Sequence, residues 1–127
     1  MNEAILNQVK QKIDEIFPKV VAFRRDLHAH PELSGHEDRT SRRILEELEK
    51  LGVPARVTPE KAVVGTVAGS GAAPTGKYFG LGIRADFDAL PITEATGLDY
   101  ASQNPGVMHA CGHDMHTAML LGTAMVL

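Results

Sequence analysis

The sequence predicts an α/β fold, with two N-terminal helices followed by a mixed sheet and covering helices. Apolar residues recur every three or four positions through the first fifty residues, which is typical of amphipathic helices. After Gly52 the pattern changes to short β-branched segments bounded by glycine and proline. Residues 115–127 are apolar on all sides, as in a buried helix. A chain of 127 residues is long enough for one domain and too short to expect two.

The first helix is predicted from a stripe of apolar residues. Its members are Ile5, Val9, Ile13, Ile16, Val20, Phe23 and Leu27. Pro18 lies within this stripe and predicts a kink, because proline removes a backbone donor from the helix interior.

The second helix is expected after the segment "HPELSG" (residues 30–35). Ser34 and Glu37 have the spacing of a capping box, which predicts that the helix starts there. Gly52 stands where a glycine commonly ends a helix. The residues expected on the buried face are Ile44, Leu45, Leu48 and Leu51.

Three strands are predicted after the second helix. Residues 55–60 ("ARVTPE") and 62–69 ("AVVGTVAG") are short and β-branched, and residues 70–76 are expected to form a loop. Residues 77–86 ("KYFGLGIRAD") are apolar on both faces, which predicts a central strand of a covered sheet. Residues 87–110 show no helical period, and irregular segments of that length are usually functional or disordered.

The composition excludes several classes of protein. Thirteen basic and sixteen acidic residues give a net charge of −3, and no basic cluster suggests nucleic-acid binding. The N-terminus lacks the features of a signal peptide, and the longest apolar stretch is shorter than the roughly 20 residues of a membrane span. The single cysteine predicts a reducing, cytoplasmic setting.

The last helix, from about Asp114, has no stop signal, so we expect the natural sequence to continue.

The segment "HACGHDMH" (residues 109–116) is the strongest candidate for chemistry. Cys111 and His113 are two residues apart, so both side chains can point to one side of a turning backbone. A thiolate and an imidazole suit zinc, while imidazole and carboxylate also suit manganese or cobalt. Asp114 is a candidate ligand, an orienting group for an imidazole, or a helix N-terminal anion. The alternative is structural, because a lone cysteine is usually a small hydrophobe and a lone histidine a surface or core residue.

A second candidate group is the acidic pair in "IRADFDALP" (residues 83–91). Asp86 and Asp88 follow the strongest predicted strand, where α/β folds place functional groups. The alternative is that both aspartates form turns at the start of a loop.

Two other functions are excluded by the positions of their motifs. The string "GLGIRA" does not lead into a helix, which excludes dinucleotide binding. Cys111 and His113 are too close in sequence for a nucleophile–base pair.

Three sequence blocks together resemble the M20 metallopeptidase family, in particular its amidohydrolase branch. They are "RRDLHAHPELSGHE", "GIRADFDALPI" and "MHACGHDMHTAMLLGTA", and they occur in the family order over nearly the whole chain. This branch includes N-acyl-amino-acid amidohydrolases, hippurate hydrolases and auxin-conjugate hydrolases. The resemblance implies a zinc-peptidase-like catalytic domain with two divalent metal ions, zinc or manganese, and a smaller lid or dimerisation domain inserted later.

The resemblance also implies roles for individual residues. Cys111 and His113 would be metal ligands, and Asp88 would orient one of the ligands. Asp86 takes the position of a ligand histidine of the wider family, and Asp114 that of its metal-bridging aspartate. Both are therefore candidates for the metal or its surroundings. Five further residues of the matched blocks receive no direct metal role; these are His28, His30, Glu32, His109 and His116.

The implied reaction is metal-assisted hydrolysis of an amide bond in N-acyl amino acids or related small conjugates, by a protein that can dimerise. In the family a general-base glutamate and further ligands follow the Cys-x-His block, whereas the last glutamate here is Glu94. Residues 1–127 would then be the N-terminal portion of one M20-type catalytic domain, inactive alone. The alternative is a short, non-catalytic metal-binding or interaction module built from the first half of the fold.

Overall fold

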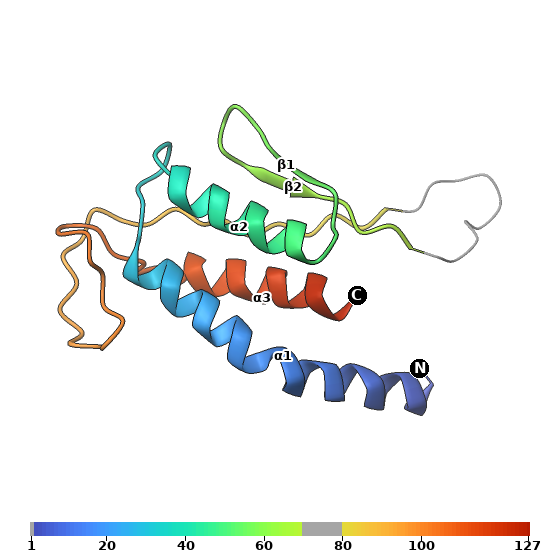
Figure 1. The fold of residues 1–127 in the computed structure, drawn as a ribbon. Coiled ribbons are helices and arrows are strands. Elements are labelled where there is room, and N and C mark those ends of the chain that lie inside the picture. Colours follow the sequence, from blue (N-terminus) through green and yellow to red (C-terminus); the bar gives the residue numbers. More distant parts are fainter. Residues whose placement is uncertain (1, 70–79) are drawn as a thin grey trace.

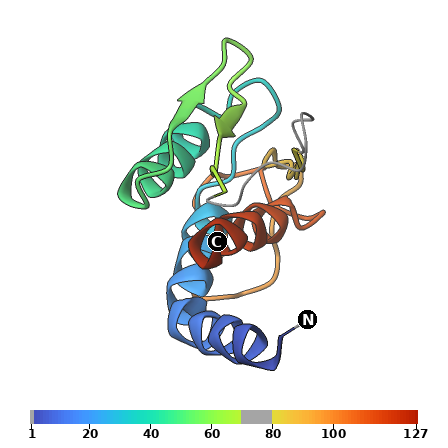
Figure 2. The ribbon, with the colours of Figure 1, turned by 90° about the vertical axis from the view of Figure 1, so that its right-hand side faces the viewer.

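A computed structural model describes residues 2–69 and 80–127. In chain order it contains helices α1 (Glu3–Ala29) and α2 (Asp38–Lys50), strands β1 (Ala55–Val57) and β2 (Val63–Gly65), and helix α3 (His113–Val126). Helices α1 and α3 lie side by side, and α2 with the β1–β2 hairpin packs beside them (Figures 1 and 2). This combination of helices and a small sheet confirms the α/β class. The predicted loop at 70–76 lies outside the described residues.

The first predicted helix is confirmed as α1, which includes Pro18 and changes direction near its middle (Figure 1). The Asn2 side chain accepts a hydrogen bond from the backbone N–H of Ala4 and so caps the first turn. The apolar stripe is buried only in its second half. Phe23 and Leu27 are in the core, whereas Ile5 and Ile13 are exposed because α3 packs against the later turns of α1.

The core lies where α1, α2 and α3 meet. Its buried members are Phe23, Leu27, Ile44, Ala118, Leu121 and Met125. Gly122 of α3 faces Val20 of α1 so closely that an added Cβ would lie 3.3 Å from a Val20 methyl carbon. The absence of a side chain at residue 122 therefore lets these two helices approach each other.

The predicted capping box at the start of α2 is wrong. Glu37 is the N-cap residue but its side chain makes no capping hydrogen bond, and Ser34 lies four residues before the helix. The Glu32 carboxylate takes this role, because it accepts the backbone N–H groups of Arg39 at 3.1 Å and Thr40 at 2.8 Å. These are N–H groups that a helix leaves without an internal partner, and a carboxylate is also favoured at the positive end of the helix.

We expect Glu32→Ala to lower the free energy of unfolding by about 1 kcal/mol, as the loss of an N-cap typically does. Chemical denaturation followed by circular dichroism measures this change. Glu49→Ala is the matched control, since Glu49 is exposed near the end of the same helix. Equal stability of the two variants would contradict a capping role for Glu32.

The end of α2 and the following hairpin agree with the sequence. Gly52 adopts a φ of +71°, a left-handed conformation that glycine favours after a helix. The two strands pair antiparallel, with Ala55 opposite Gly65 and Val57 opposite Val63. The predicted strands at residues 55–60 and 62–69 are therefore confirmed, although each is shorter than expected.

The predicted central strand at 77–86 is not formed in its described part. Residues 80–88 are assigned to no strand, and Leu81 and Ile83 are 79% and 54% exposed. Their apolar character predicted burial on both faces, but a strand also needs a hydrogen-bonded neighbour. Strands β1 and β2 pair with each other, and no other described segment pairs along residues 80–88.

Residues 87–110 form an irregular segment, as predicted, and backbone contacts hold it against the end of α1. The N–H of Ala89 donates to the carbonyl of Glu32, and that of Gln103 to the carbonyl of Ala29, both at 2.8 Å. This path brings Asp88 to His113 at the start of α3, and Glu94 to His28 at the end of α1. The ring of His109 lies 6.3 Å from that of His28, centroid to centroid. Over residues 2–69 and 80–127, no helix has the length and apolarity to cross a membrane.

Candidate metal centre

The candidate centre is built around the start of α3. Gly112 has a φ of +88°, a left-handed conformation that turns the chain sharply into the helix at His113. The next two side chains then take different directions. His113 contacts Asp88, whereas Asp114 is buried against α1.

His113 is held by Asp88 through two oxygen atoms. Its Nδ1 lies 2.8 Å from the Asp88 carboxylate and 3.0 Å from the Asp88 backbone carbonyl. Both oxygens are acceptors in an ionised carboxylate and a carbonyl, so Nδ1 must donate. The neutral ring then keeps its lone pair on Nε2, which is the tautomer a metal-binding histidine commonly has.

Cys111 lies two residues before this histidine and is exposed. A thiolate and the Nε2 of His113 are a suitable pair of donors for zinc. Within the described ranges no three His, Cys, Asp or Glu side chains are arranged to hold a metal ion. Cys111 and His113 therefore fit part of a metal site, since catalytic zinc usually has three protein ligands.

Asp86 is turned toward Arg84, unlike Asp88. Its carboxylate lies 2.9 Å from Nε and 2.7 Å from Nη2 of Arg84. Its backbone carbonyl accepts a hydrogen bond from Thr117 of α3. The structure thus brings Asp88 to His113 and pairs Asp86 with a neighbouring arginine.

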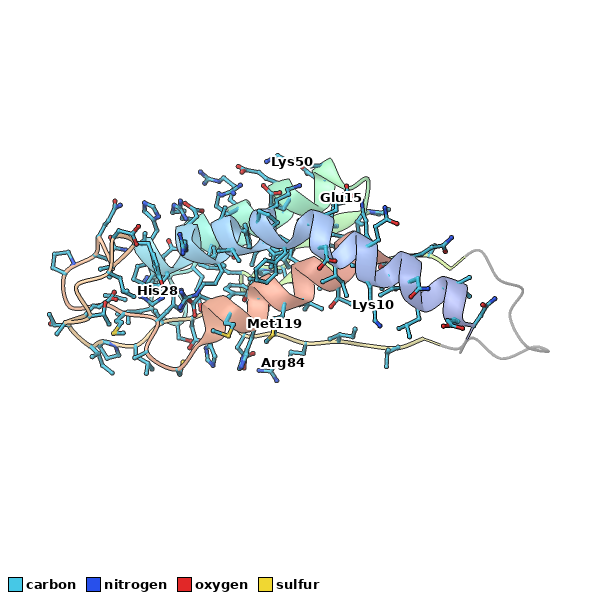
Figure 3. All side chains as sticks on the ribbon, turned by 90° about the horizontal axis from the view of Figure 1, so that it is seen from below. Lys10, Glu15, His28, Lys50, Arg84 and Met119 are labelled. Carbon is cyan, nitrogen blue, oxygen red and sulfur yellow. The ribbon has the colours of Figure 1, made fainter. Side chains whose placement is uncertain are left out.

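Asp114 is fully buried, with 0% exposure, and contacts α1. Its Oδ2 lies 2.8 Å from Nε of Arg24 and 2.8 Å from Nδ1 of His28. Its Oδ1 has no hydrogen-bond partner among the described residues. On the other side of the His28 ring, Nε2 lies 3.1 Å from a Glu94 carboxylate oxygen. His28 stands at the end of α1, among the side chains of this region (Figure 3).

The sequence did not predict that Arg24 and Glu94 lie near the candidate site. Arg24 lies four residues before His28, so the helical period places both on one face of α1. This spacing would have predicted that Arg24 lies beside His28, had a role for His28 been expected. Glu94 had no such signal, because only the path of the irregular segment brings it to His28, 66 residues away in sequence.

Hydrogen bonds make Glu94 a stronger acid than an ordinary glutamate. Burial alone would raise the pKa of Glu94, but hydrogen bonds from Thr96, the backbone N–H of Ser102 and His28 lower it from 4.5 to about 2. These donors favour the ionised carboxylate.

A lowered pKa stabilises the folded protein above the pKa of the unfolded glutamate, and this stabilisation is lost as the pH falls toward the folded value. We therefore expect the stability contributed by Glu94 to disappear between about pH 4.5 and pH 2. Thermal unfolding measured across this range is expected to show a shallower acid dependence for Glu94→Gln than for the wild type. Glu60→Gln, at an exposed position, is the control and should keep the wild-type slope.

Among the described residues, His30, His109 and His116 make no hydrogen bond to Cys111 or His113. His109 is 3% exposed, and neither ring nitrogen has a partner within residues 2–69 and 80–127; burial lowers the pKa of this histidine. Nδ1 of His30 lies 2.8 Å from the backbone carbonyl of Asp26. The ring of His116 lies 5.8 Å from that of His113, centroid to centroid.

Comparison with known proteins identifies the class to which this arrangement belongs. Residues 82–127 match the family model for peptidase family M20/M25/M40. The chain is 48% identical over 120 residues to an N-acyl-L-amino acid amidohydrolase of Geobacillus stearothermophilus, covering 94% of this chain and 31% of that relative. It is 46% identical over 110 residues to an N-acetyl-L-cysteine deacetylase of Bacillus subtilis, covering 86% of this chain and 25% of that relative.

A solved structure agrees with these matches. The Bacillus subtilis protein YxeP, described as a dinuclear metal-binding peptidase from the M20 family, superposes with a TM-score of 0.80 and 42% sequence identity. The match covers 90% of this chain and 31% of that chain. The class of fold is thus that of the α/β domains of M20-type peptidases. The chain belongs to the M20 peptidase family, as its three sequence blocks predicted, and spans roughly a third or less of the length of these relatives.

Proposed function

We propose that the protein is a metal-dependent amidohydrolase that cleaves the amide bond of N-acyl amino acids or related small conjugates. The observation that carries this proposal is the likeness to an N-acyl-L-amino acid amidohydrolase along 94% of the chain. The family-model match over residues 82–127 includes Cys111 and His113. The pairing of His113 with Asp88 supports it, because it leaves the ring in the tautomer that binds metal.

Cys111 and His113 would hold the metal, which is zinc or manganese in this proposal. A divalent ion, when bound, polarises the scissile carbonyl and activates water for attack. Asp88 fixes the His113 ring and keeps its Nδ1 protonated. A relative described as a dinuclear metal-binding peptidase supports the use of divalent metal, and we extend this to a two-ion centre here.

Two donors are fewer than a catalytic metal requires, so the remaining ligands and a general-base glutamate would come from sequence beyond these residues. We therefore propose that residues 1–127 are one portion of a single catalytic domain and are inactive alone. A cytoplasmic location, a homodimer and a later lid or dimerisation domain complete the proposal. A non-catalytic module remains the competing function.

The test compares the product of the complete gene with residues 1–127 alone. Both are stripped with a chelator and assayed against a panel of N-acetyl amino acids, with Zn²⁺, Mn²⁺ or Co²⁺ added in turn. We expect metal-restored hydrolysis by the complete product and none by residues 1–127. Absence of hydrolysis by a folded, metal-loaded complete product would favour the non-catalytic module.

A further inference from the structure

A buried polar group connects α1, the irregular segment and the first turn of α3, away from the metal-binding side chains. It consists of Arg24, His28, Glu94 and Asp114, which we call the α1–α3 polar cluster. Asp114 and the Glu94 and His28 side chains are almost completely buried, with 0%, 4% and 4% exposure. Burying charged groups is costly unless they are paired, and each of these groups has a charged or hydrogen-bonding partner.

His28 is the central member of the α1–α3 polar cluster. Its Nδ1 contacts Asp114 of α3, and its Nε2 contacts Glu94 of the irregular segment. Glu94 is itself held in place, because the backbone N–H of Ser102 donates to its second oxygen at 2.6 Å. The ring therefore has a fixed orientation from which it contacts Asp114.

Asp114 directly follows His113 in the first turn of α3. Neighbouring residues of one helical turn move together, so a change in the position of Asp114 is transmitted to His113 through the backbone. Functional groups need to be held within about 0.5 Å of their working position, and this precision depends on the residues that support them. Asp88 fixes the ring of His113, whereas the α1–α3 polar cluster fixes the helix turn that carries it.

We propose that His28 is a positioning residue for the metal centre: through its Nδ1 contact with Asp114, it fixes the first turn of α3 and so the placement of His113. This inference rests on the proposed function, in which His113 binds metal. His28 contacts neither metal nor substrate in this role. Its contact with Glu94 orients the ring but does not itself place α3.

Two substitutions separate the two carboxylate contacts of His28, whose Nδ1 also lies 3.2 Å from Nη2 of Arg24. The amide nitrogen of asparagine can take the place of Nδ1, so His28→Asn keeps a donor toward Asp114 and loses the contact with Glu94. The amide nitrogen of glutamine can take the place of Nε2, so His28→Gln keeps a donor toward Glu94 and loses the contact with Asp114. Both remove the ring, so a purely structural role predicts similar effects for the two variants. His30→Gln is the matched control, because the Nδ1 of His30 lies within hydrogen-bond distance of a backbone carbonyl of its own helix.

The probe is Co²⁺, titrated into the chelator-stripped product of the complete gene, with the thiolate-to-cobalt absorption band and the ligand-field spectrum as readouts. We expect His28→Gln to weaken Co²⁺ binding 10- to 100-fold, as loss of a supporting partner typically does, and to change the spectrum at saturation. His28→Asn and His30→Gln are expected to stay within about threefold of the wild type. Thermal unfolding in chelator measures stability separately.

Equal Co²⁺ affinities and identical saturated spectra for His28→Asn and His28→Gln would overturn the proposal. If His28→Gln does not fold, Arg24→Gln removes the other partner of Asp114 Oδ2 at a partly exposed position and is expected to change the spectrum in the same way. An unchanged spectrum in Arg24→Gln would then overturn it. Failure of the proposed function is distinct, because the wild type itself would bind no Co²⁺ through a thiolate.

Discussion

Cys111→Ser and His113→Ala are each expected to lower kcat/KM for N-acetyl amino acids by about three orders of magnitude in the product of the complete gene. A hydroxyl is a much poorer ligand than a thiolate, and alanine provides none. In the proposed reaction a bound metal would supply several kcal/mol of transition-state stabilisation, and each 1.36 kcal/mol corresponds to a tenfold change in rate. Steady-state kinetics and the metal content after dialysis measure the two consequences.

His116→Ala is the control for these variants. His116 is exposed and its ring lies next to that of His113, so it experiences the same surroundings without a ligand role in this proposal. We expect its metal content and kcat/KM to remain within a few-fold of the wild type. Retention of metal by Cys111→Ser together with its loss in His116→Ala would show that the assigned ligands are wrong.

The dense motif around Cys111 was visible in the sequence because its chemistry is local. Cys111 and His113 are separated by one residue, and this spacing alone marks them as possible ligands. The residue between them, Gly112, adopts a left-handed conformation before α3. The contact between Asp88 and His113 was different. It joins residues 25 apart, and only the resemblance to a family suggested that Asp88 orients a ligand. Spacing alone left Asp86 and Asp88 equivalent, whereas the structure places only Asp88 at His113.

The burial of Asp114 against α1 could not be predicted from its neighbours in sequence. A carboxylate at the start of a helix is favoured by the positive helix end, and most such residues are solvated. Here the partners come from α1, 86 residues earlier for His28, and they remove Asp114 from water completely. The apolar stripe of residues 5–27 predicted α1 and the continuous apolar run of residues 115–127 predicted α3, but neither pattern predicted the polar contacts between the two helices.

Two errors in the predicted fold have the same origin. Ser34 and Glu37 have the spacing of a capping box, but the N–H groups at the start of α2 donate to the Glu32 carboxylate instead. The apolar segment around Ile83 satisfied a strand pattern, but a strand also needs a partner from elsewhere in the chain. Ile83 and Leu81 instead remain exposed, and Arg84 lies near Met119 on the same side of the molecule (Figure 3). Local patterns thus predicted the helices and the hairpin strands correctly, whereas contacts outside these patterns decided the cap of α2 and the absence of a strand at residues 80–88.

Asp114→Ala is expected to destabilise the protein by about 3–5 kcal/mol, the typical cost of removing one partner from a buried ion pair. The substitution leaves the Arg24 Nε and the His28 Nδ1 facing a small apolar side chain in place of a carboxylate. His28 would retain its contact with Glu94, but Arg24 would lose its only described carboxylate partner. Such a loss is a large fraction of the total stability of a small domain.

Urea denaturation of the metal-free product of the complete gene measures the effect, because without metal the change cannot arise from lost metal binding. Asp99→Ala is the matched control, since Asp99 is exposed in the irregular segment and is expected to change stability by less than about 0.5 kcal/mol. A further variant, Arg24→Met with Asp114→Leu, replaces the ion pair by apolar groups. Because the burial cost of both charges then disappears, this double variant is expected to be more stable than Asp114→Ala alone. Equal stability of Asp114→Ala and Asp99→Ala would mean that the Asp114 carboxylate does not hold α1 and α3 together.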